Sequence, residues 1–299
     1  MHSLERAASE DDEPLLVVRD VSLAFVERRG ESVRAVRDIS LDVERGECFG
    51  IVGESGSGKT TLARCILRLE RVDSGTIRFR GEDWLGLKPP QLRARRRYMQ
   101  AVFQDPAASL NPLLMAGAIV AEPLRIHGIG CRRERRGRVE ELLQAVGLQA
   151  ADYFKRPQEF SGGQRQRVAI ARAIACEPEL LIADEPTSAV DLSGQAQILD
   201  LLASFNRERN LAILLISHSL PVIRRMCRRM AVVWRGQVVE MGPASAIFSS
   251  PRHPYTQALL EVSPLEIGGR RLDSPPRIHP PAEPGTLREI APGHWAREQ

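Results

Sequence analysis

Hydrophobic and polar positions alternate with two different periods along the chain. From Leu15 to Val43, apolar residues recur at about every second position in the runs LLVVRDVSLAF and VRAVRDISLDV, which predicts antiparallel strands with one buried face. Other apolar runs show no alternation and have the length of fully buried strands. They lie at 47–53, 180–184 and 211–217. Helix-period stretches follow each of these runs, so the pattern predicts a parallel sheet with right-handed crossovers, an α/β fold.

The middle and the two ends of the chain differ from this core. Residues of about 90–160 are rich in Arg and carry helical patterns interrupted by prolines, which predicts an inserted helical subdomain. The segment MAVVWRGQVVEMG predicts a hairpin that turns at Arg235-Gly236. We expect residues 1–13 to form a disordered tail, residues 14–250 the main domain, and the proline-rich residues 251–299 an irregular C-terminal extension.

Composition excludes several classes of protein. The 299 residues suffice for one large core or two modest ones, and a net charge of +4 is too small to argue for nucleic-acid binding. The five cysteines form no C-x-x-C pair, which argues against a disulfide framework or a zinc site. The acidic start of the chain does not resemble a secretory signal, and apolar runs stay short of the roughly 18–20 residues that span a bilayer. If the protein acts at a membrane, we expect partner chains to supply the span.

A glycine-rich segment supplies the clearest candidate chemistry. Residues 53–60, GESGSGKT, match the pattern G-x-x-x-x-G-K-[ST] between a predicted strand and a predicted helix. Glycines leave backbone N–H groups free to point at a polyphosphate, whereas the competing interpretation is a glycine-rich turn with an incidental lysine. Lys59 is expected to bridge the β- and γ-phosphates and Thr60 to reach Mg²⁺. The predicted nucleotide-binding residues here are Gly53, Glu54, Ser55, Gly56, Ser57, Gly58, Lys59, Thr60 and Thr61.

Two carboxylates lie at the end of the predicted strand at 180–184. Asp184 closes that strand and would lie beside the phosphate loop, where it could hold Mg²⁺ through water. Glu185 comes next and could act as the general base toward the attacking water. A solvated strand end bearing two acids is the alternative, which the preceding phosphate loop disfavours.

A third segment predicts a second anion-binding helix start. Ser161 and Gln164 have the spacing of a capping box, so a helix should begin there, and Gly162 and Gly163 leave its N–H groups uncovered. The alternative is an ordinary capped helix. One chain with two such termini can serve one nucleotide with each if two chains pair head to tail.

In combination, these motifs resemble the ATP-binding-cassette (ABC) ATPases over about residues 15–265. The resemblance implies a P-loop NTPase (RecA-like) core with an antiparallel β-subdomain, ATP and Mg²⁺ as cofactors, and ATP hydrolysis. It assigns Gln104 to the Q-loop, which contacts Mg²⁺ and the attacking water, and residues 188–191, ending at Asp191, to the D-loop at the dimer interface. It makes His218 the switch histidine expected at the γ-phosphate. Phe25 fits the aromatic that stacks on adenine, although a core phenylalanine remains open.

Further segments resemble the oligopeptide, dipeptide and nickel branch of bacterial ABC importers. They are QDPAASLNP at 104–112, EPLRIH at 122–127, QAQ at 195–197 and HPYTQALL at 253–260. The resemblance implies a peripheral subunit on the cytoplasmic face of the bacterial inner membrane that couples ATP hydrolysis to peptide uptake. The implied partners are two membrane-spanning permease subunits, a related but distinct second ATPase and, indirectly, a solute-binding protein.

Several alternatives remain beside peptide import. Nickel or another small solute is the cargo of some members of this branch. A soluble ABC ATPase acting on nucleic acid or ribosomes usually has two cassettes or a long coiled coil, which this sequence lacks, and Lys59, Glu185 and His218 argue against a pseudo-ATPase. Many members of the branch carry clustered C-terminal cysteines, but here no cysteine follows Cys227, so we predict no iron–sulfur cluster. The small net charge and the single cassette lead us to predict no nucleic-acid partner.

Overall fold

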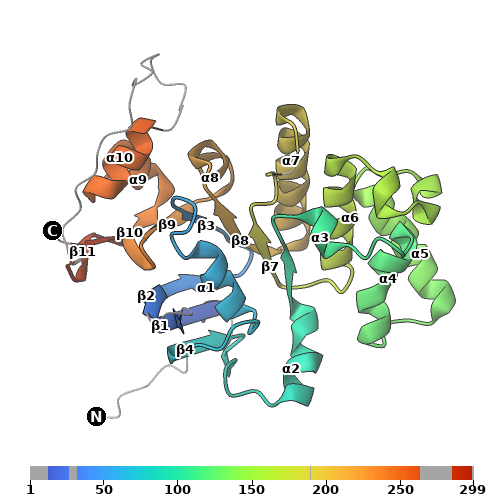
Figure 1. Cartoon of the computed structure of the whole chain (residues 1–299), viewed down its shortest axis with the longest axis horizontal. Coiled ribbons are helices and arrows are strands. Elements are labelled where there is room, and N and C mark those ends of the chain that lie inside the picture. Colours follow the sequence, from blue (N-terminus) through green and yellow to red (C-terminus); the bar gives the residue numbers. More distant parts are fainter. Residues whose placement is uncertain (1–12, 27–31, 189, 263–284, 298–299) are drawn as a thin grey trace, which may run out of the picture.

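The computed structural model describes residues 13–26, 32–188, 190–262 and 285–297. The expected N-terminal tail (except its last residue) and Ala189 of the expected D-loop therefore lie outside the described residues. Within the described part, the strands form a four-stranded and an eight-stranded sheet (Figure 1). The predicted α/β core with an antiparallel β-subdomain is confirmed.

The smaller sheet contains the alternating segments. Its order is β2-β1-β4-β5, and β1 pairs antiparallel with both β2 and β4. Its strands are β1 (Leu16–Val26), β2 (Ser32–Val43), β4 (Ser74–Phe79) and β5 (Glu82–Asp83). In β2 the side chains of Ile39, Leu41 and Val43 are buried and the residues between them are not, as the period of two requires.

The larger sheet has the order β11-β12-β10-β9-β3-β8-β7-β6 within the described residues. Its strands are β3 (Cys48–Val52), β6 (Met99–Val102), β7 (Leu180–Asp184), β8 (Ala212–Ser217), β9 (Arg229–Trp234), β10 (Gln237–Pro243), β11 (Leu287–Ala291) and β12 (His294–Arg297). Strands β3, β7 and β8 run parallel and are buried at every position, which explains why their sequences show no alternation.

Helices cover the larger sheet and extend to one side of it (Figure 1). The α-helices are α1 (Lys59–Ile66), α2 (Pro89–Arg95), α3 (Pro106–Ser109), α4 (Ala116–Ile126), α5 (Arg132–Ala145), α6 (Gly162–Ile174), α7 (Leu192–Arg209), α8 (Leu220–Met226), α9 (Ala244–Ser249) and α10 (Pro254–Val262). Three 3₁₀ turns within the described residues are η1 (Arg96–Tyr98), η2 (Ala150–Phe154) and η3 (Pro157–Glu159).

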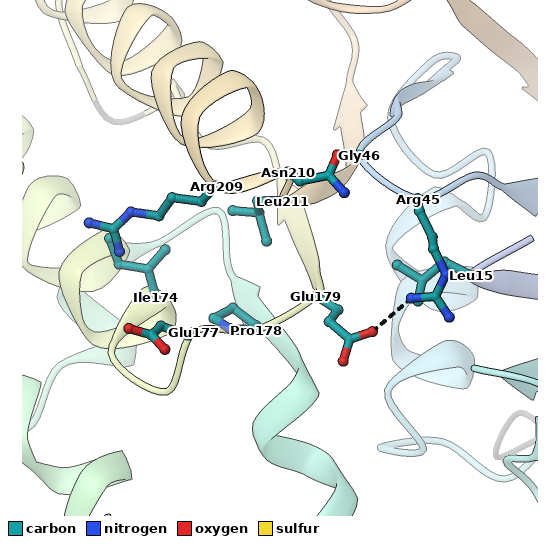
Figure 2. Close-up of a pocket in the computed structure, with 10 residues that line it drawn as sticks. All are labelled: Leu15, Arg45, Gly46, Ile174, Glu177, Pro178, Glu179, Arg209, Asn210 and Leu211. Carbon is teal, nitrogen blue, oxygen red and sulfur yellow. Dashed lines mark hydrogen bonds and ion pairs between the residues drawn. The ribbon is translucent and has the colours of Figure 1, made fainter. Parts of the chain in front are cut away.

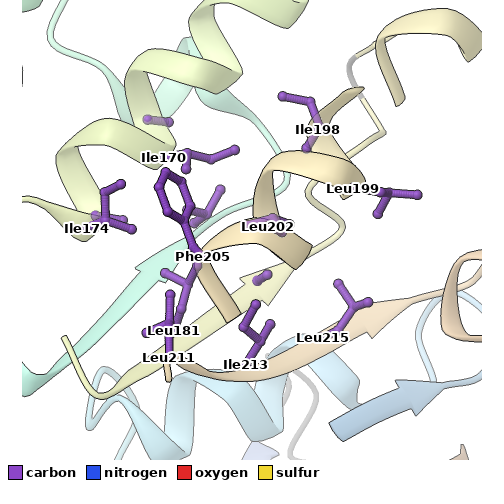
Figure 3. Packing of buried hydrophobic residues seen from close by; sticks show 14 of the residues in the cluster. Ile170, Ile174, Leu181, Ile198, Leu199, Leu202, Phe205, Leu211, Ile213 and Leu215 are labelled. Carbon is purple, nitrogen blue, oxygen red and sulfur yellow. The ribbon is translucent and has the colours of Figure 1, made fainter. Parts of the chain in front are cut away.

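Helices α6 and α7 join the catalytic core to the helical region. Ile170 of α6 and Phe205 of α7 pack in one buried cluster with Ile213 of β8 (Figure 3). Phe205 is only 3% exposed, and burying such a side chain contributes about 2 kcal/mol. Both helices therefore pack against the sheet that carries the phosphate loop.

Two segments differ from the sequence-based expectation. The insertion expected at about 90–160 contains β6, which pairs in parallel with β7 in the larger sheet, because a four-residue strand beside Arg-rich helices gives no distinct pattern. Residues after Pro251 were expected to be irregular, yet α10 forms and the hairpin β11–β12 adds to β10. Pro254 is compatible with α10 because it occupies the first helical position, where no intrahelical N–H bond is lost.

The predicted hairpin at Arg235-Gly236 is confirmed between β9 and β10. Both turn residues have positive φ, 47° and 80°, as a tight turn between twisted strands requires. Among the described residues, no helix has the length and apolarity needed to cross a bilayer.

Candidate active site

The phosphate loop joins the carboxyl end of β3 to the first turn of α1. Gly58 is the N-cap of α1 with φ 103°, and Gly56 has φ 79°, both in the region that favours glycine. A Cβ at Gly58 would lie 2.2 Å from the carbonyl oxygen of Ala35 on β2. The loop therefore needs glycine here for conformation and for space, and it presents the N-terminus of α1 to an anion.

Lys59 spans the loop that precedes it. Its Nζ donates to the carbonyl oxygens of Gly53 and Glu54, both at 2.7 Å. The side chain is buried, and burial lowers the pKa of Lys59, whereas Glu185 and Asp184 oppose that shift. Such a desolvated cation can interact strongly with a phosphate.

Asp184 provides a fitting ligand for Mg²⁺. It ends β7 and is 2% exposed, and burial raises the pKa of its carboxyl group, while the Thr60 side chain opposes the shift. Its Oδ1 is buried and is one of the few such side-chain atoms, among the described residues, with no hydrogen-bond partner. An unpaired buried carboxylate oxygen close to the Thr60 hydroxyl suits a hard divalent cation.

Glu185 and His218 form a direct pair at the carboxyl ends of β7 and β8. Glu185 Oε1 accepts from the backbone N–H of His218 at 2.8 Å and lies 2.8 Å from His218 Nδ1. The Glu185 side chain is 10% exposed, whereas that of His218 is 65% exposed. Glu185 also has φ 50°, which is unusual for a residue with a long side chain and typical of functional sites.

Gln104 lies in the exposed turn between β6 and α3. Its carbonyl oxygen accepts from Ser188 Oγ at 3.1 Å, and the same hydroxyl donates to the carbonyl oxygen of Glu185 at 3.0 Å. Ser188 thus ties the segment of Gln104 to the candidate general base. The sequence pattern assigned Ser188 only to the D-loop and did not predict this connection.

The second predicted anion site forms a separate, exposed groove. The predicted capping box is confirmed: Ser161 N–H donates to Gln164 Oε1 at 3.0 Å, and Gln164 N–H donates to Ser161 Oγ at 3.3 Å. A groove of about 390 Å³ is lined by Ser161, Gly162, Gly163 and Gln164 of α6 together with Asp191 and neighbours at the start of α7. We call it the signature groove. No described residue of the phosphate loop is among those that line it.

Phe25 lies near the end of β1 opposite Val33 of β2 and is 41% exposed, so it is not a core residue. The register places it two residues along the hairpin from Ala35, whose carbonyl oxygen faces Gly58. An exposed aromatic ring this close along the hairpin to the residue that faces Gly58 is suited to stack on a nucleotide base.

A pocket of about 460 Å³ lies elsewhere (Figure 2). It includes Glu179 and Leu211, which immediately precede β7 and β8, and Glu179 Oε2 accepts from Arg45 Nη1 at 3.0 Å. The pocket is therefore at the amino ends of the parallel strands. The phosphate loop, Asp184 and His218 all follow carboxyl ends, where ligands of such sheets bind.

A residue of the C-terminal segment contacts the phosphate loop, which the sequence did not predict. The backbone N–H of Glu54 donates to Tyr255 Oη at 3.0 Å. Tyr255 belongs to the HPYT segment, which was noted only as a mark of the importer branch.

Family models match two parts of the chain. The ABC transporter model matches residues 36–188, and the model of the oligopeptide/dipeptide transporter C-terminal region matches residues 239–291. The oligopeptide transport ATP-binding protein OppF of Bacillus subtilis (strain 168) is 43% identical over 292 residues, which cover 95% of each chain.

Two further proteins extend the comparison. The glutathione import ATP-binding protein GsiA of Salmonella paratyphi A is 42% identical over 309 residues, and this chain spans about half (50%) of its length. The dimeric ATP-binding cassette MJ0796, solved with ADP and Pi, superposes with a TM-score of 0.71 and 31% identity over 77% of this chain and 98% of that one.

Proposed function

This chain belongs to the ABC transporter family, and from that premise we propose that it is the ATP-hydrolysing subunit of a bacterial importer that takes up peptides. Hydrolysis is supported by the convergence of Lys59, Asp184, Glu185 and His218 at the carboxyl ends of β3, β7 and β8. The peptide cargo is supported chiefly by the match to the oligopeptide/dipeptide C-terminal region over residues 239–291. The similarity to GsiA favours glutathione, itself a tripeptide, as a second candidate within the same class.

In this proposal each side chain has a distinct task. The N–H groups at the start of α1 and Lys59 Nζ bind the phosphates, and Phe25 stacks on the adenine. Thr60, Asp184 and Gln104 would hold Mg²⁺, which supplies charge neutralisation at the phosphates when bound. Because Oε1 of Glu185 is held by His218, and no described residue donates to Oε2, the second oxygen is left to take the proton of the attacking water. His218, held through Nδ1, presents its exposed Nε2 toward the γ-phosphate.

The two anion sites become one through pairing of chains. ATP bound at the phosphate loop of one chain contacts the signature groove of another, so ATP stabilises the closed pair more than the open one. A ligand shifts such an equilibrium only through that difference in affinity. Hydrolysis removes the bridging charge and the pair reopens. We infer that the second chain is a related, distinct ATPase.

The remaining partners follow from the transport role. Two permease subunits supply the membrane span, a solute-binding protein delivers the peptide, and this chain lies on the cytoplasmic face of the inner membrane. The absence of cysteine after Cys227 supports the proposal that the chain carries no iron–sulfur cluster.

The experiment that tests the function is the substitution Glu185→Gln. It removes the proton acceptor and keeps the shape, so we expect ATP to bind while phosphate release falls by about 10²–10⁴-fold. With the related partner ATPase added, light scattering should then detect an ATP-dependent pair of chains. Glu140→Gln, on the exposed face of α5, is the matched control and should hydrolyse ATP normally. Unchanged phosphate release by Glu185→Gln would remove Glu185 from the reaction.

The cargo needs a separate measurement. In cells that lack this chain, uptake of a labelled tripeptide should return with the wild-type protein and not with Glu185→Gln. If the purified protein hydrolyses ATP but the wild type restores no di- or tripeptide uptake, the peptide assignment is wrong and the ATPase assignment stands.

A further inference from the structure

We infer that the C-terminal segment holds the phosphate loop in its binding conformation through Tyr255, which acts as a positioning residue for nucleotide. This inference rests on the proposed function, because it requires that the loop bind ATP. Tyr255 follows Glu54 by 201 positions in the sequence, yet its hydroxyl accepts the Glu54 N–H at 3.0 Å.

The contact acts on the part of the loop that Lys59 also holds. The carbonyl oxygen of Glu54 accepts from Lys59 Nζ at 2.7 Å, so the N–H and the C=O of this one residue are both held, by two different side chains. Loss of the Tyr255 hydroxyl would leave the Glu54 N–H without that acceptor and allow the loop to change its path. Such a change would reach Lys59, because Lys59 binds the same residue.

Tyr255 is itself rigidly placed. It is 1% exposed, and its ring centroid lies 5.5 Å from that of Trp234 at an interplanar angle of 31°. Trp234 comes directly before the turn whose Gly236 N–H donates to the Ser57 carbonyl oxygen at 2.9 Å. The β9–β10 hairpin and α10 therefore contact the phosphate loop at two places, Ser57 and Glu54.

A buried carboxylate anchors this arrangement to the end of the chain. Glu240 on β10 is fully buried, and it accepts the backbone N–H of His253 at 3.0 Å and lies 2.8 Å from His294 Nε2 of β12. The N–H of Tyr255 in turn donates to His253 Nδ1 at 3.1 Å. Hydrogen bonds thus run without interruption from β12 through Glu240, His253 and Tyr255 to the phosphate loop.

Ionisation does not disturb the contact near neutral pH. Burial raises the pKa of Tyr255 to about 12, so its hydroxyl stays neutral in the cell. The link should therefore act as a constant support for the loop and not as a pH switch.

A purely structural role for Tyr255 gives a different expectation, which makes the inference testable. If the Tyr255 hydroxyl served only the stability of the fold, Tyr255→Phe would lower thermal stability and leave nucleotide affinity unchanged. If it positions the loop, the affinity for adenylyl-imidodiphosphate should fall by about 3- to 10-fold, the effect of one lost hydrogen bond to a buried donor. Titration calorimetry on the full chain measures this, with Tyr153→Phe in the helical region as the matched control.

Hydrogen exchange supplies a second measurement that does not depend on nucleotide binding. The amide of Glu54 should be protected in the wild type, and Tyr255→Phe should raise its exchange while β3 stays protected. Rapid exchange at Glu54 in the wild type, or equal analogue affinity in Tyr255→Phe and wild type, would overturn the inference alone. A wild type that binds no analogue would overturn the proposed function as well.

Discussion

The phosphate loop and the signature groove are both starts of helices in one chain, yet they are built differently. Around the phosphate loop, Lys59, Asp184 and Glu185 are all less than a tenth exposed. Lys59 and Glu185 also form hydrogen bonds with Gly53 and His218, which follow strands β3 and β8. In the signature groove, Ser161 is exposed, and it forms hydrogen bonds with Gln164 and with the backbone N–H of Arg165, both in α6. The core thus preforms the first half-site and leaves the second open.

This difference indicates how binding energy can drive movement. A preformed half-site can bind nucleotide without a partner chain. The free-energy cost of burying its charged groups, and of the strained backbone at Glu185 (φ 50°), is already offset when the chain folds. An exposed half-site gains its contacts only when a second molecule covers it. The proposed function therefore makes nucleotide binding and chain pairing separable steps, and substitutions should separate them.

The largest effect should come from blocking the open half-site. Ser161→Arg places a long side chain in the signature groove, so ATP-dependent pairing should be lost and hydrolysis should fall by at least about 100-fold, as on removal of a preorganised donor. ATP binding to the single chain should be unchanged. Sedimentation of this chain mixed with its partner ATPase, in the Glu185→Gln background, measures pairing. Ser250→Arg, on another exposed surface, is the control, and a Ser161→Arg variant that still pairs would contradict the division into two half-sites.

A smaller effect should come from the exposed edge of the preformed half-site. Phe25→Ala removes the ring proposed to stack on adenine. This should weaken ATP binding by about 5- to 10-fold, because a half-exposed ring provides the low end of the stacking range, about 1 kcal/mol. Phe25→Trp should retain the affinity. Fluorescence titration with a labelled nucleotide measures both, with Phe154→Ala as an exposed-phenylalanine control. Equal affinity of Phe25→Ala and wild type would exclude the stacking role.

The smallest effect should appear in the stability of the nucleotide-free chain. Burial raises the pKa of the Asp184 carboxyl group. The stability that this group contributes in its protonated form is therefore fully present below the usual pKa of Asp and is lost as pH rises through the raised pKa. At neutral pH the carboxylate therefore costs stability, and Asp184→Asn should raise the Tm by about 2 °C. The gain should shrink as pH falls through the raised pKa.

Calorimetry over a pH series tests this expectation. Asp200→Asn on the exposed face of α7 should leave the Tm unchanged. A lower Tm for Asp184→Asn at neutral pH would show that the preformed half-site is not under electrostatic strain at this residue.

Local sequence patterns predicted the parts of the molecule that local physics determines. The spacing of Ser161 and Gln164 was sufficient for the capping box, and unbroken apolar runs were sufficient for β3, β7 and β8. The positive φ at Arg235-Gly236 follows from a two-residue turn between two antiparallel strands. In each case the determining residues are neighbours in sequence.

The features that escaped prediction depend on distant residues or very short segments. β6 has four residues and is stabilised as a strand by pairing with β7, about 80 positions away. Hairpin β11–β12 likewise needs β10 to complete it. The bond between Tyr255 and Glu54 joins residues 201 positions apart, and no pattern within HPYT indicates its partner. The pairing of Glu185 with His218 was not predicted, because each residue was assigned a role toward water or phosphate and not toward the other.

The C-terminal hairpin has a consequence for solubility. β12 pairs with β10, and β11 then forms the rim of the sheet with exposed polar residues, among them Glu289. Strand β10 is buried over most of its length and rich in Val and Met, so with an unpaired backbone edge it would be a template for strand addition by other copies. The hairpin, with β11 as its short, charged outer strand, therefore protects the hydrophobic strand β10 from aggregation.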